Sequence, residues 1–269
     1  MKSLKLALAV QNCIPGNFKQ NLKNCFYFIN DAADKGAEII VFPEMNLTGY
    51  TANDRILDVA RKIDNTVIDP FSEISRKAKI TILAGLAEKS DQTLYATHLV
   101  FFPDGTYGSY RKIHTAPFEK RYLTPGNDIP IFNASNICFG LQLCYDAHFP
   151  ELTLAMSLRG VDMVFIPHAS PRGTPAEKCE SWMRHLRARA FDNGIFIAAC
   201  NQTGNNTTGL LFPGISLVIG PDGNVLYESA NNIEELHVID LDMDFLTEIR
   251  RHKMKYFLPN RRNDLFNGI

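Results

Sequence analysis

The chain opens with apolar and polar segments whose spacing predicts a strand, a helix and a second strand. Residues 4–10 form an apolar run interrupted only by Lys5, which is typical of a buried strand. Between residues 17 and 35, apolar side chains recur every three or four positions, as the buried face of an amphipathic helix requires. Gly36 ends this helix, and residues 38–42, which are apolar after Glu38, predict another buried strand.

The same alternation continues along the chain and divides it into two similar halves. Pro-Asp-Gly turns at 103–105 and 221–223 predict two β-hairpins. The hairpin strands are 94–102 with 106–112 and 215–219 with 225–227; the other segments are a helix ending near Lys79, strands at 80–87, 137–143, 162–166 and 195–199, and helices at 150–159 and 175–193. Two successive β-α-β-α-β-β units favour an α/β fold in which two sheets pack together with helices outside.

Composition narrows the class of protein. The 269 residues are 45% hydrophobic, which suffices for one large core, and no segment rich in Gly, Pro or Ser divides the chain. We therefore expect residues 1–269 to form a single domain. Lys and Arg number 28 and Asp and Glu 29, so the net charge of −1 argues against a general attraction to nucleic acid or to a membrane surface.

Location and redox state can also be predicted from the sequence. No apolar run reaches membrane-spanning length and the first ten residues lack a signal-peptide pattern, so we expect a cytoplasmic protein without membrane contacts. The six cysteines have no paired spacing, which favours free thiols in a reducing compartment and no metal site. The basic C-terminal segment, 250–269, predicts a solvated tail or one that contacts another subunit.

Cys144 is the first candidate for chemistry. The apolar run 137–143 stops at this cysteine, a polar turn follows, and Pro150 opens a helix. A thiol at such a junction lies at the carboxyl edge of a sheet, near backbone N–H groups that can stabilise an oxyanion. A small buried cysteine is the common alternative, so the presence of partners for the thiol decides between the two interpretations.

A cysteine nucleophile needs a base and a cation, and several residues are candidates. Glu44 directly follows an apolar strand, where a carboxylate without a partner is rarely buried. Lys112 ends the first hairpin, where an ammonium could bind an oxyanion and lower the pKa of the thiol. Glu119 lies shortly after this lysine, and His148 is an alternative base close to Cys144 in sequence.

These residues stand in local sequences that together resemble the nitrilase superfamily of carbon–nitrogen hydrolases. The matching segments are Phe42-Pro43-Glu44 with Leu47-Thr48-Gly49-Tyr50; Tyr110-Arg111-Lys112-Ile113-His114; Glu119-Lys120-Arg121-Tyr122 with Thr124-Pro125-Gly126; and Cys144-Tyr145-Asp146 with Phe149-Pro150-Glu151. Weaker matches at 187–193, 201–204 and 261–265 extend the resemblance over nearly the whole chain. It implies a four-layer α-β-β-α sandwich of two mixed sheets with outer helices, assembled into a homodimer or larger homo-oligomer.

The resemblance also implies a role for each residue. Cys144 would be the nucleophile and Glu44 the general base. Lys112 would stabilise the oxyanion with the backbone N–H of Tyr145, and Glu119 would be an accessory acid that positions Lys112. The thiol would attack a carbonyl carbon and form a thioester, which water activated by Glu44 would hydrolyse. No metal or organic cofactor is implied, and we expect Cys144→Ala and Lys112→Ala to remove nearly all turnover with the fold intact.

The substrate is less closely defined. The expected reaction hydrolyses a C–N bond in a small aliphatic amide and releases ammonia or an amine; a carbamoyl amine or N-carbamoyl amino acid is the alternative substrate, and a nitrile is less favoured. Some relatives bind a substrate carboxylate through an arginine shortly after the nucleophile, but Ala147 and His148 occupy those positions here, so Arg172 becomes the candidate. Further candidates for the pocket lining are Tyr145, His148, Phe149 and Trp182.

Two other functions fit the sequence less well. A non-catalytic scaffold of the same fold would not need Glu44, Lys112 and Cys144 to be intact. A thiol redox enzyme would normally need a resolving cysteine close to the reactive one. Cys138 lies in the same predicted strand as Cys144, and the extended chain between them is too long for a disulfide.

Overall fold

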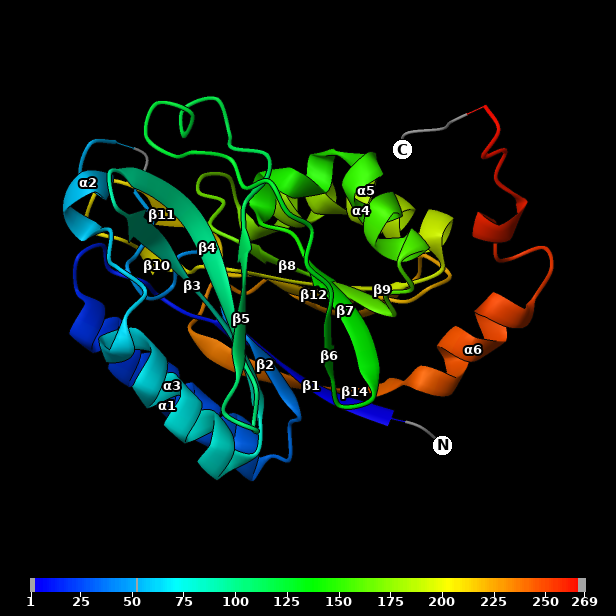
Figure 1. Cartoon of the computed structure of the whole chain (residues 1–269), viewed down its shortest axis with the longest axis horizontal. Coiled ribbons are helices and arrows are strands. Elements are labelled where there is room, and N and C mark those ends of the chain that lie inside the picture. The colour runs from blue at the N-terminus through cyan, green and yellow to red at the C-terminus, as the bar shows by residue number, and fades with distance from the viewer. Residues whose placement is uncertain (1–2, 52, 266–269) are drawn as a thin grey trace.

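The first of two six-stranded sheets is built from the N-terminal half of the chain and one late strand. The computed structural model describes residues 3–51 and 53–265. The strands of this sheet are β1 (Ser3–Val10), β2 (Ile39–Val41), β3 (Thr81–Ser90), β4 (Thr93–Phe101), β5 (Tyr107–Arg111) and β14 (Glu235–Asp242). Their order is β14-β1-β2-β3-β4-β5; β1, β2 and β3 run parallel, and the other neighbours are antiparallel (Figure 1).

The second sheet repeats this topology with the C-terminal half. Its strands are β6 (Phe132–Ala134), β7 (Ile137–Leu141), β8 (Met163–His168), β9 (Phe196–Asn201), β12 (Ser216–Ile219) and β13 (Val225–Ser229). Their order is β13-β12-β9-β8-β7-β6, again with three parallel strands in the middle. Ligand sites in α/β proteins form at the carboxyl ends of parallel strands, so each half contributes one such edge.

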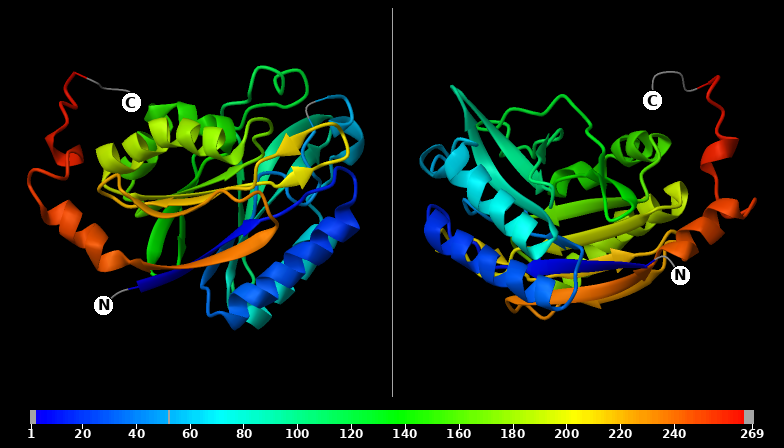
Figure 2. Two further views of the ribbon diagram at one scale, coloured as in Figure 1. Left: turned by 180° about the vertical axis from the view of Figure 1, so that it is seen from behind. Right: turned by 60° about the horizontal axis from the view of Figure 1, so that its bottom comes forward.

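Helices cover the outer face of each sheet and complete four layers, α-β-β-α (Figure 2). α1 (Phe18–Asp34) and α3 (Asn65–Ala78) pack on the first sheet, whereas α4 (Pro150–Leu158) and α5 (Pro175–Asn193) cover the second. The predicted α/β sandwich of two mixed sheets with outer helices is therefore confirmed. Within residues 3–51 and 53–265, no helix is long and apolar enough to cross a membrane.

Strand β1 shows why its sequence is an almost unbroken apolar run. Leu6 and Leu8 belong to the core between the two sheets, whereas Ala7 and Ala9 pack on the side covered by α1 and α3. Successive residues of a strand point to opposite faces, so a strand covered on both sides needs apolar residues at nearly every position. Lys5, the exception, is half-buried.

Several elements were not predicted from the sequence. They are α2 (Ile56–Val59), β6, β10 (Gly204–Asn205), β11 (Leu211–Phe212), β14, α6 (Met243–Arg251) and two short 3-10 turns, η1 (Cys144–His148) and η2 (Leu258–Asn260). One strand is also shorter than predicted. The strand expected at 137–143 ends at Leu141, because the carboxylate of Asp146 accepts the N–H of Leu143 at 2.9 Å and turns the chain into η1.

The C-terminal segment predicted to contact another subunit, 250–269, begins within α6, and its residues 266–269 lie outside the described part of the chain. Arg250 binds within the chain, to the carboxylate of Asp162 at 2.8 Å. Beyond α6 the segment leads away from the second sheet, and Met254 is 79% exposed (Figure 1). Subunit contacts through this segment, a homo-oligomer, a single domain and a cytoplasmic location all stay predictions.

Candidate active site

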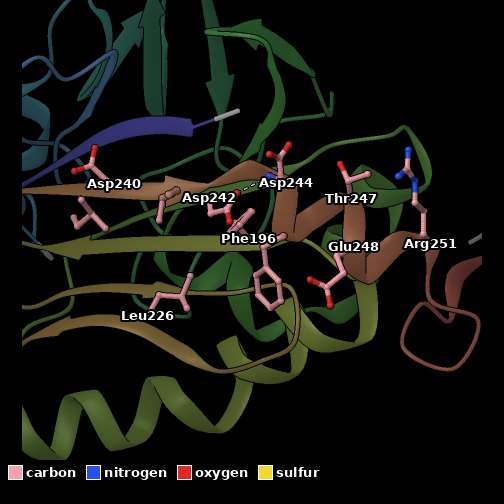
Figure 3. A pocket seen from close by; sticks show the side chains of 11 residues that line it. Phe196, Leu226, Asp240, Asp242, Asp244, Thr247, Glu248 and Arg251 are labelled. Carbon is pink, nitrogen blue, oxygen red and sulfur yellow. Dashed lines mark hydrogen bonds between the residues drawn. The ribbon is translucent and has the colours of Figure 1, made fainter. Parts of the chain in front are cut away.

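Two cavities of the molecule differ in the side chains that line them. One, of about 780 Å³, lies between β13, β14 and α6 (Figure 3). It is lined by carboxylates, Arg251 and apolar side chains such as Phe196, and its lining includes no cysteine, histidine or lysine. The other, of about 560 Å³, is lined by Cys144 and Lys112 among others and is the candidate active site. No part of residues 3–51 and 53–265 groups three His, Cys, Asp or Glu side chains so as to hold a metal ion.

A buried lysine bridges two glutamates at this second cavity. The Nζ atom of Lys112 donates to Glu44 Oε1 at 2.8 Å and lies 3.1 and 3.0 Å from the two carboxylate oxygens of Glu119. The side chains of Lys112 and Glu44 are each 1% exposed, and that of Glu119 is 5% exposed. Charged groups are rarely buried unless they are paired. The structure thus brings together three residues that the sequence singled out at distant positions.

Strand ends carry the residues of the site. Glu44 follows β2, and Lys112 directly follows β5 in the first sheet. Cys144 follows β7 of the second sheet and begins η1. Lys112, Glu119 and Cys144 all line the cavity, and the carboxylate of Glu44 contacts the lining residue Lys112. The site therefore forms where the carboxyl ends of strands from both sheets meet.

Backbone contacts with the second sheet fix Glu44. Its Oε2 accepts the N–H of Ala169 at 3.0 Å, and its own N–H donates to the carbonyl of His168 at 3.3 Å. The carbonyl of Glu44 accepts a hydrogen bond from Gln202 Nε2 at 2.8 Å. Because His168 ends β8 and Gln202 follows β9, the second sheet determines where the carboxylate of the first sheet lies.

Tyr50 and a backbone N–H hold Glu119. The hydroxyl of Tyr50 donates to Glu119 Oε1 at 3.0 Å, and the N–H of Ala116 donates to Oε2 at 2.8 Å. The preceding residue, Gly49, has a φ of +73°, and a Cβ there would lie 2.4 Å from the nitrogen of Pro15, so only glycine fits. The sequence placed Tyr50 in a matching segment but gave no signal of its role, because its partner is distant in the chain.

Asp146 ties the turn that begins at Cys144 to the chain on both sides of Lys112. Its Oδ2 accepts the hydroxyl of Tyr110 at 2.8 Å and the N–H of Leu143 at 2.9 Å. Its Oδ1 accepts the N–H of His114 at 2.7 Å and lies 2.9 Å from Nδ1 of the same residue. Tyr110 and His114 each lie two positions from Lys112. Asp146 therefore couples the position of Cys144 to that of the Lys112 ammonium.

We expect Asp146→Asn to lower kcat much more than it raises KM. Cys144 has a φ of +43°, and this left-handed conformation costs a non-glycine residue about 1–3 kcal/mol, so the surrounding contacts must hold it. An amide puts a donor where Asp146 has an acceptor, and an unpaired buried group costs about 1–3 kcal/mol, so kcat should fall about 10- to 100-fold. Steady-state kinetics test this. Tyr110→Phe removes only the hydroxyl that donates to Asp146, so its kcat should fall less. An unchanged kcat in Asp146→Asn would exclude the positioning role of Asp146.

Burial and mutual charge set the protonation of the site. Burial raises the pKa of Glu44 to about 7; Lys112 opposes this rise and Glu119 adds to it. Burial also disfavours the charge of Lys112, but the two glutamates outweigh it and raise its pKa well above the usual value. Burial, followed by the charge of Glu44, raises the pKa of the Cys144 thiol to about 12, although Lys112 lowers it. The resting site holds an ammonium and a protonated thiol.

Lys112 lowers the pKa of Cys144, as predicted, but other effects on the thiol are larger. Removal of the thiol from water and the nearby carboxylate of Glu44 outweigh the effect of Lys112. A thiol acts as a nucleophile only when it loses its proton. Glu44, whose pKa is raised to about 7, is suited to accept that proton near neutral pH.

The other predicted pocket residues fall into two groups. The ones that line the cavity are Tyr145, His148 and Arg172. Phe149 instead stacks on His114, with ring centroids 3.8 Å apart and planes 9° from parallel. Trp182 is 3% exposed and packs against His168 with centroids 3.9 Å apart, in the core. Large aromatic side chains are as readily drawn into packing as into a pocket lining.

A family comparison establishes what the chain is. The sequence profile of the family described as carbon-nitrogen hydrolase matches residues 6–251. The chain belongs to the carbon-nitrogen hydrolase family. The predicted resemblance to the nitrilase superfamily is confirmed by this match and by the relatives of the chain.

Relatives of this carbon-nitrogen hydrolase include amidases and nitrilases. It is 31% identical to Omega-amidase NIT2 from Homo sapiens over 99% of its own length and 98% of the relative's. It is 28% identical to a nitrilase from Pyrococcus abyssi, in a match that covers 92% of this chain and 93% of the relative. Its fold matches that of an amidase from Nesterenkonia sp. with a TM-score of 0.82 at 26% identity. The match covers 99% of this chain and 96% of the amidase. In a glutamate-to-glutamine variant of that amidase, the acetamide moiety of fluoroacetamide is covalently added to the active-site cysteine.

Proposed function

We propose that this hydrolase cleaves the C–N bond of a small aliphatic amide through a thioester on Cys144, releasing ammonia or an amine. The observation that carries the proposal is the buried bridge from Lys112 to Glu44 and Glu119, beside a cavity that Cys144 also lines. Acyl transfer to a cysteine needs a nucleophile, a base and a group that stabilises the oxyanion, and we assign these roles to Cys144, Glu44 and Lys112.

In the first half-reaction, Glu44 takes the thiol proton while the sulfur of Cys144 attacks the carbonyl carbon of the amide. The carbonyl oxygen becomes an oxyanion, which the ammonium of Lys112 and the backbone N–H of Tyr145 stabilise. When the tetrahedral intermediate collapses, the C–N bond breaks and Glu44 gives its proton to the departing nitrogen. Ammonia or an amine leaves, and the acyl group remains on sulfur as a thioester.

In the second half-reaction, water replaces the departed nitrogen. Glu44 takes a proton from this water as its oxygen attacks the thioester carbon, and Lys112 again stabilises the oxyanion. Collapse breaks the C–S bond, the sulfur recovers the proton from Glu44, and the carboxylic acid leaves. Glu119 acts through its bonds to Lys112, which keep the ammonium in place for both steps.

Glu44 is a better base than the sequence alternative, His148. Glu44 is buried and bonded to the lysine of the site, and burial raises its pKa to about 7. His148 is exposed, and its ring packs against those of Tyr145 and His185. Neighbouring side chains still shield part of the ring from water, and this desolvation and the charge of Arg189 lower the pKa of His148, which makes it a weaker base at neutral pH.

The rate of hydrolysis should depend on pH through the ionisation of Glu44. Only the ionised carboxylate accepts the thiol proton, so kcat/KM should fall about tenfold per pH unit below the Glu44 pKa, which is raised to about 7. The raised pKa of Cys144 keeps the thiol protonated throughout this range. Measurement of kcat/KM with a neutral amide between about pH 5 and pH 9 tests this. A flat profile would contradict the role of Glu44 as base.

A substrate panel tests the function and separates the alternatives. Butyramide, a carbamoyl amine and a nitrile of matched chain length are compared, with ammonia and bicarbonate both measured. Ammonia without bicarbonate, released fastest from butyramide, is the expected result. Ammonia together with bicarbonate from the carbamoyl amine would favour the carbamoyl hydrolase, and preferred cleavage of the nitrile would favour a nitrilase. If no substrate turns over and iodoacetamide modifies Cys144 no faster than the other thiols, the chain is an inactive scaffold.

A further inference from the structure

A buried asparagine, Asn206, organises the loop between the short strands β10 and β11 (Figure 1). The residue is 1% exposed. Its Oδ1 accepts the N–H of Thr208 at 3.0 Å, the hydroxyl of Thr208 at 2.9 Å and the N–H of Leu210 at 3.2 Å. Its own N–H donates to the carbonyl of Leu210 at 3.1 Å. Because Leu210 lines the catalytic cavity, Asn206 holds one part of the cavity wall in place.

The other end of the same amide reaches a residue from the first half of the chain. The Nδ2 atom of Asn206 donates to the carbonyl of Tyr50 at 2.9 Å. The partners fix which end of the amide is which, because the backbone N–H groups of the loop only donate and a carbonyl only accepts. Asn206 therefore links a loop of the C-terminal half to the residue that binds Glu119.

Tyr50 is held at its backbone, its ring and its hydroxyl. Besides the bond from Asn206 to its carbonyl, its ring meets the edge of Phe212, with centroids 6.2 Å apart and planes at 85°. Its hydroxyl donates to Glu119 Oε1 at 3.0 Å. Phe212 lies on β11, so residues 204–212 supply both the backbone contact and the ring contact. The hydroxyl is at the far end of a rigid ring, so a small rotation of the backbone displaces it further than it displaces the carbonyl.

The hydroxyl of Tyr50 serves the site as a donor. Burial raises the pKa of Tyr50 well above its usual value, and the charges of Glu119, Glu44 and Cys144 add to the rise, so the hydroxyl keeps its proton. Glu119 in turn lies 3.1 and 3.0 Å from the ammonium of Lys112. Displacement of the hydroxyl would deprive a buried carboxylate oxygen of its donor and free Glu119 to move relative to Lys112.

We propose that Asn206 is a positioning residue for amide hydrolysis, because it fixes the backbone that carries the hydroxyl of Tyr50 to Glu119. Through Glu119 it acts on the ammonium of Lys112. This rests on the proposed amidase function and extends the residues that support it beyond the cavity lining. A misplacement of about 1 Å, caused far from the reacting atoms, slows a reaction by up to about 100-fold. Nothing in the local sequence marks Asn206, because Tyr50 is distant in the chain.

Asn206→Asp tests the proposal, because it removes the donor to Tyr50 and keeps an acceptor for the loop. The second carboxylate oxygen would face the carbonyl of Tyr50, and two acceptors repel each other. The kcat should fall at least about fivefold while KM changes less than about twofold, since Leu210 keeps its acceptor. Asn205→Asp is the matched control. It adds the same charge to the same loop, but Asn205 is exposed and its Oδ1 binds the N–H of Thr207, so kcat should be unchanged.

Two readouts separate positioning from a general loss of structure. In a Tyr50→Phe background the hydroxyl is already gone, so Asn206→Asp should lower kcat at most about twofold there. A protonated carboxyl can again donate to the carbonyl of Tyr50, and burial favours the protonated form. The kcat of Asn206→Asp relative to the wild type at the same pH should therefore rise as pH falls. An unchanged kcat, an equal fall in Asn205→Asp, or an equal fall in both backgrounds would overturn the positioning role.

Further measurements cover an unstable variant and an absence of turnover. If Asn206→Asp does not fold, Asn206→Ser, which is uncharged and too short to reach Tyr50, takes its place in the same cycle with Tyr50→Phe. Urea unfolding needs no turnover: Asn206→Asp should shift the midpoint less in the Tyr50→Phe background than in the wild type. Equal shifts would overturn the role of Asn206 but not the amidase. A smaller shift in that background, together with no turnover of any amide by the wild type, would overturn the amidase but not the coupling of Asn206 to Tyr50.

Discussion

Cys144→Ala should abolish amide hydrolysis, lowering kcat by roughly 10⁴-fold or more, as loss of a nucleophile does in other covalent enzymes. Without the sulfur no thioester can form, and Glu44 with Lys112 can only assist a direct attack by water. The substitution removes one atom from a half-buried side chain and leaves the Lys112 bridge untouched, so the fold and substrate binding should survive. Ammonia release and thermal unfolding, measured on the same preparation, check both parts.

Cys138→Ala is the matched control for this experiment. Cys138 lies on β7, is also half-buried and is not among the residues that line the catalytic cavity. Its replacement should leave the rate of hydrolysis unchanged. Wild-type turnover by Cys144→Ala would refute the thioester mechanism, and an equal loss in both variants would show that the effect comes from a disturbed β7.

An element of the fold could be predicted where the pattern of apolar residues in its own sequence shows which of its faces are buried. β1 is apolar on both faces because it is covered on both, and α1 and α5 carry the period of helices that pack on a sheet. β14 could not be predicted in this way. It alternates buried and exposed residues, including polar ones, and it pairs with β1 from the other end of the chain. Its stability as a strand comes from that distant pairing rather than from its own sequence.

The residues of the candidate site could likewise be predicted from the sequence, but their contacts with one another could not. Glu44, Lys112 and Cys144 each follow a strand, which marks them as candidates for a sheet edge, and the matching segments around them supplied their grouping. The contacts of Asp146 could not be predicted, because they depend on a partner, Tyr110, that only the fold brings near. The raised pKa of the thiol likewise follows from burial, which a sequence does not show.

Lys112→Met should also remove almost all turnover, but unlike Cys144→Ala it should destabilise the fold. The sequence predicted that loss of Lys112 would leave the fold intact, yet its ammonium is the bridge between two buried carboxylates. Methionine keeps the apolar stem but leaves Glu44 and Glu119 facing each other. Breaking a buried ion pair by removing one partner costs about 3–5 kcal/mol. Urea unfolding of the variant and the wild type measures this loss.

The pH dependence of the stability lost in Lys112→Met shows whether unpaired charge causes the loss. Burial raises the folded-state pKa of Glu44 to about 7 and Lys112 lowers it, so removal of Lys112 should raise it further. A raised carboxyl pKa means that folding favours the protonated form, and stability falls as pH rises from the unfolded value through the folded value. Up to about pH 7 the wild type and Lys112→Met should lose stability together. Above about pH 7 only Lys112→Met should continue to lose stability, so the difference between the two proteins should widen.

Addition of Glu119→Gln to Lys112→Met should recover stability without activity, because one carboxylate is gone and the oxyanion still lacks its cation. A difference that stays constant with pH would show that lost packing, rather than unpaired charge, destabilises Lys112→Met.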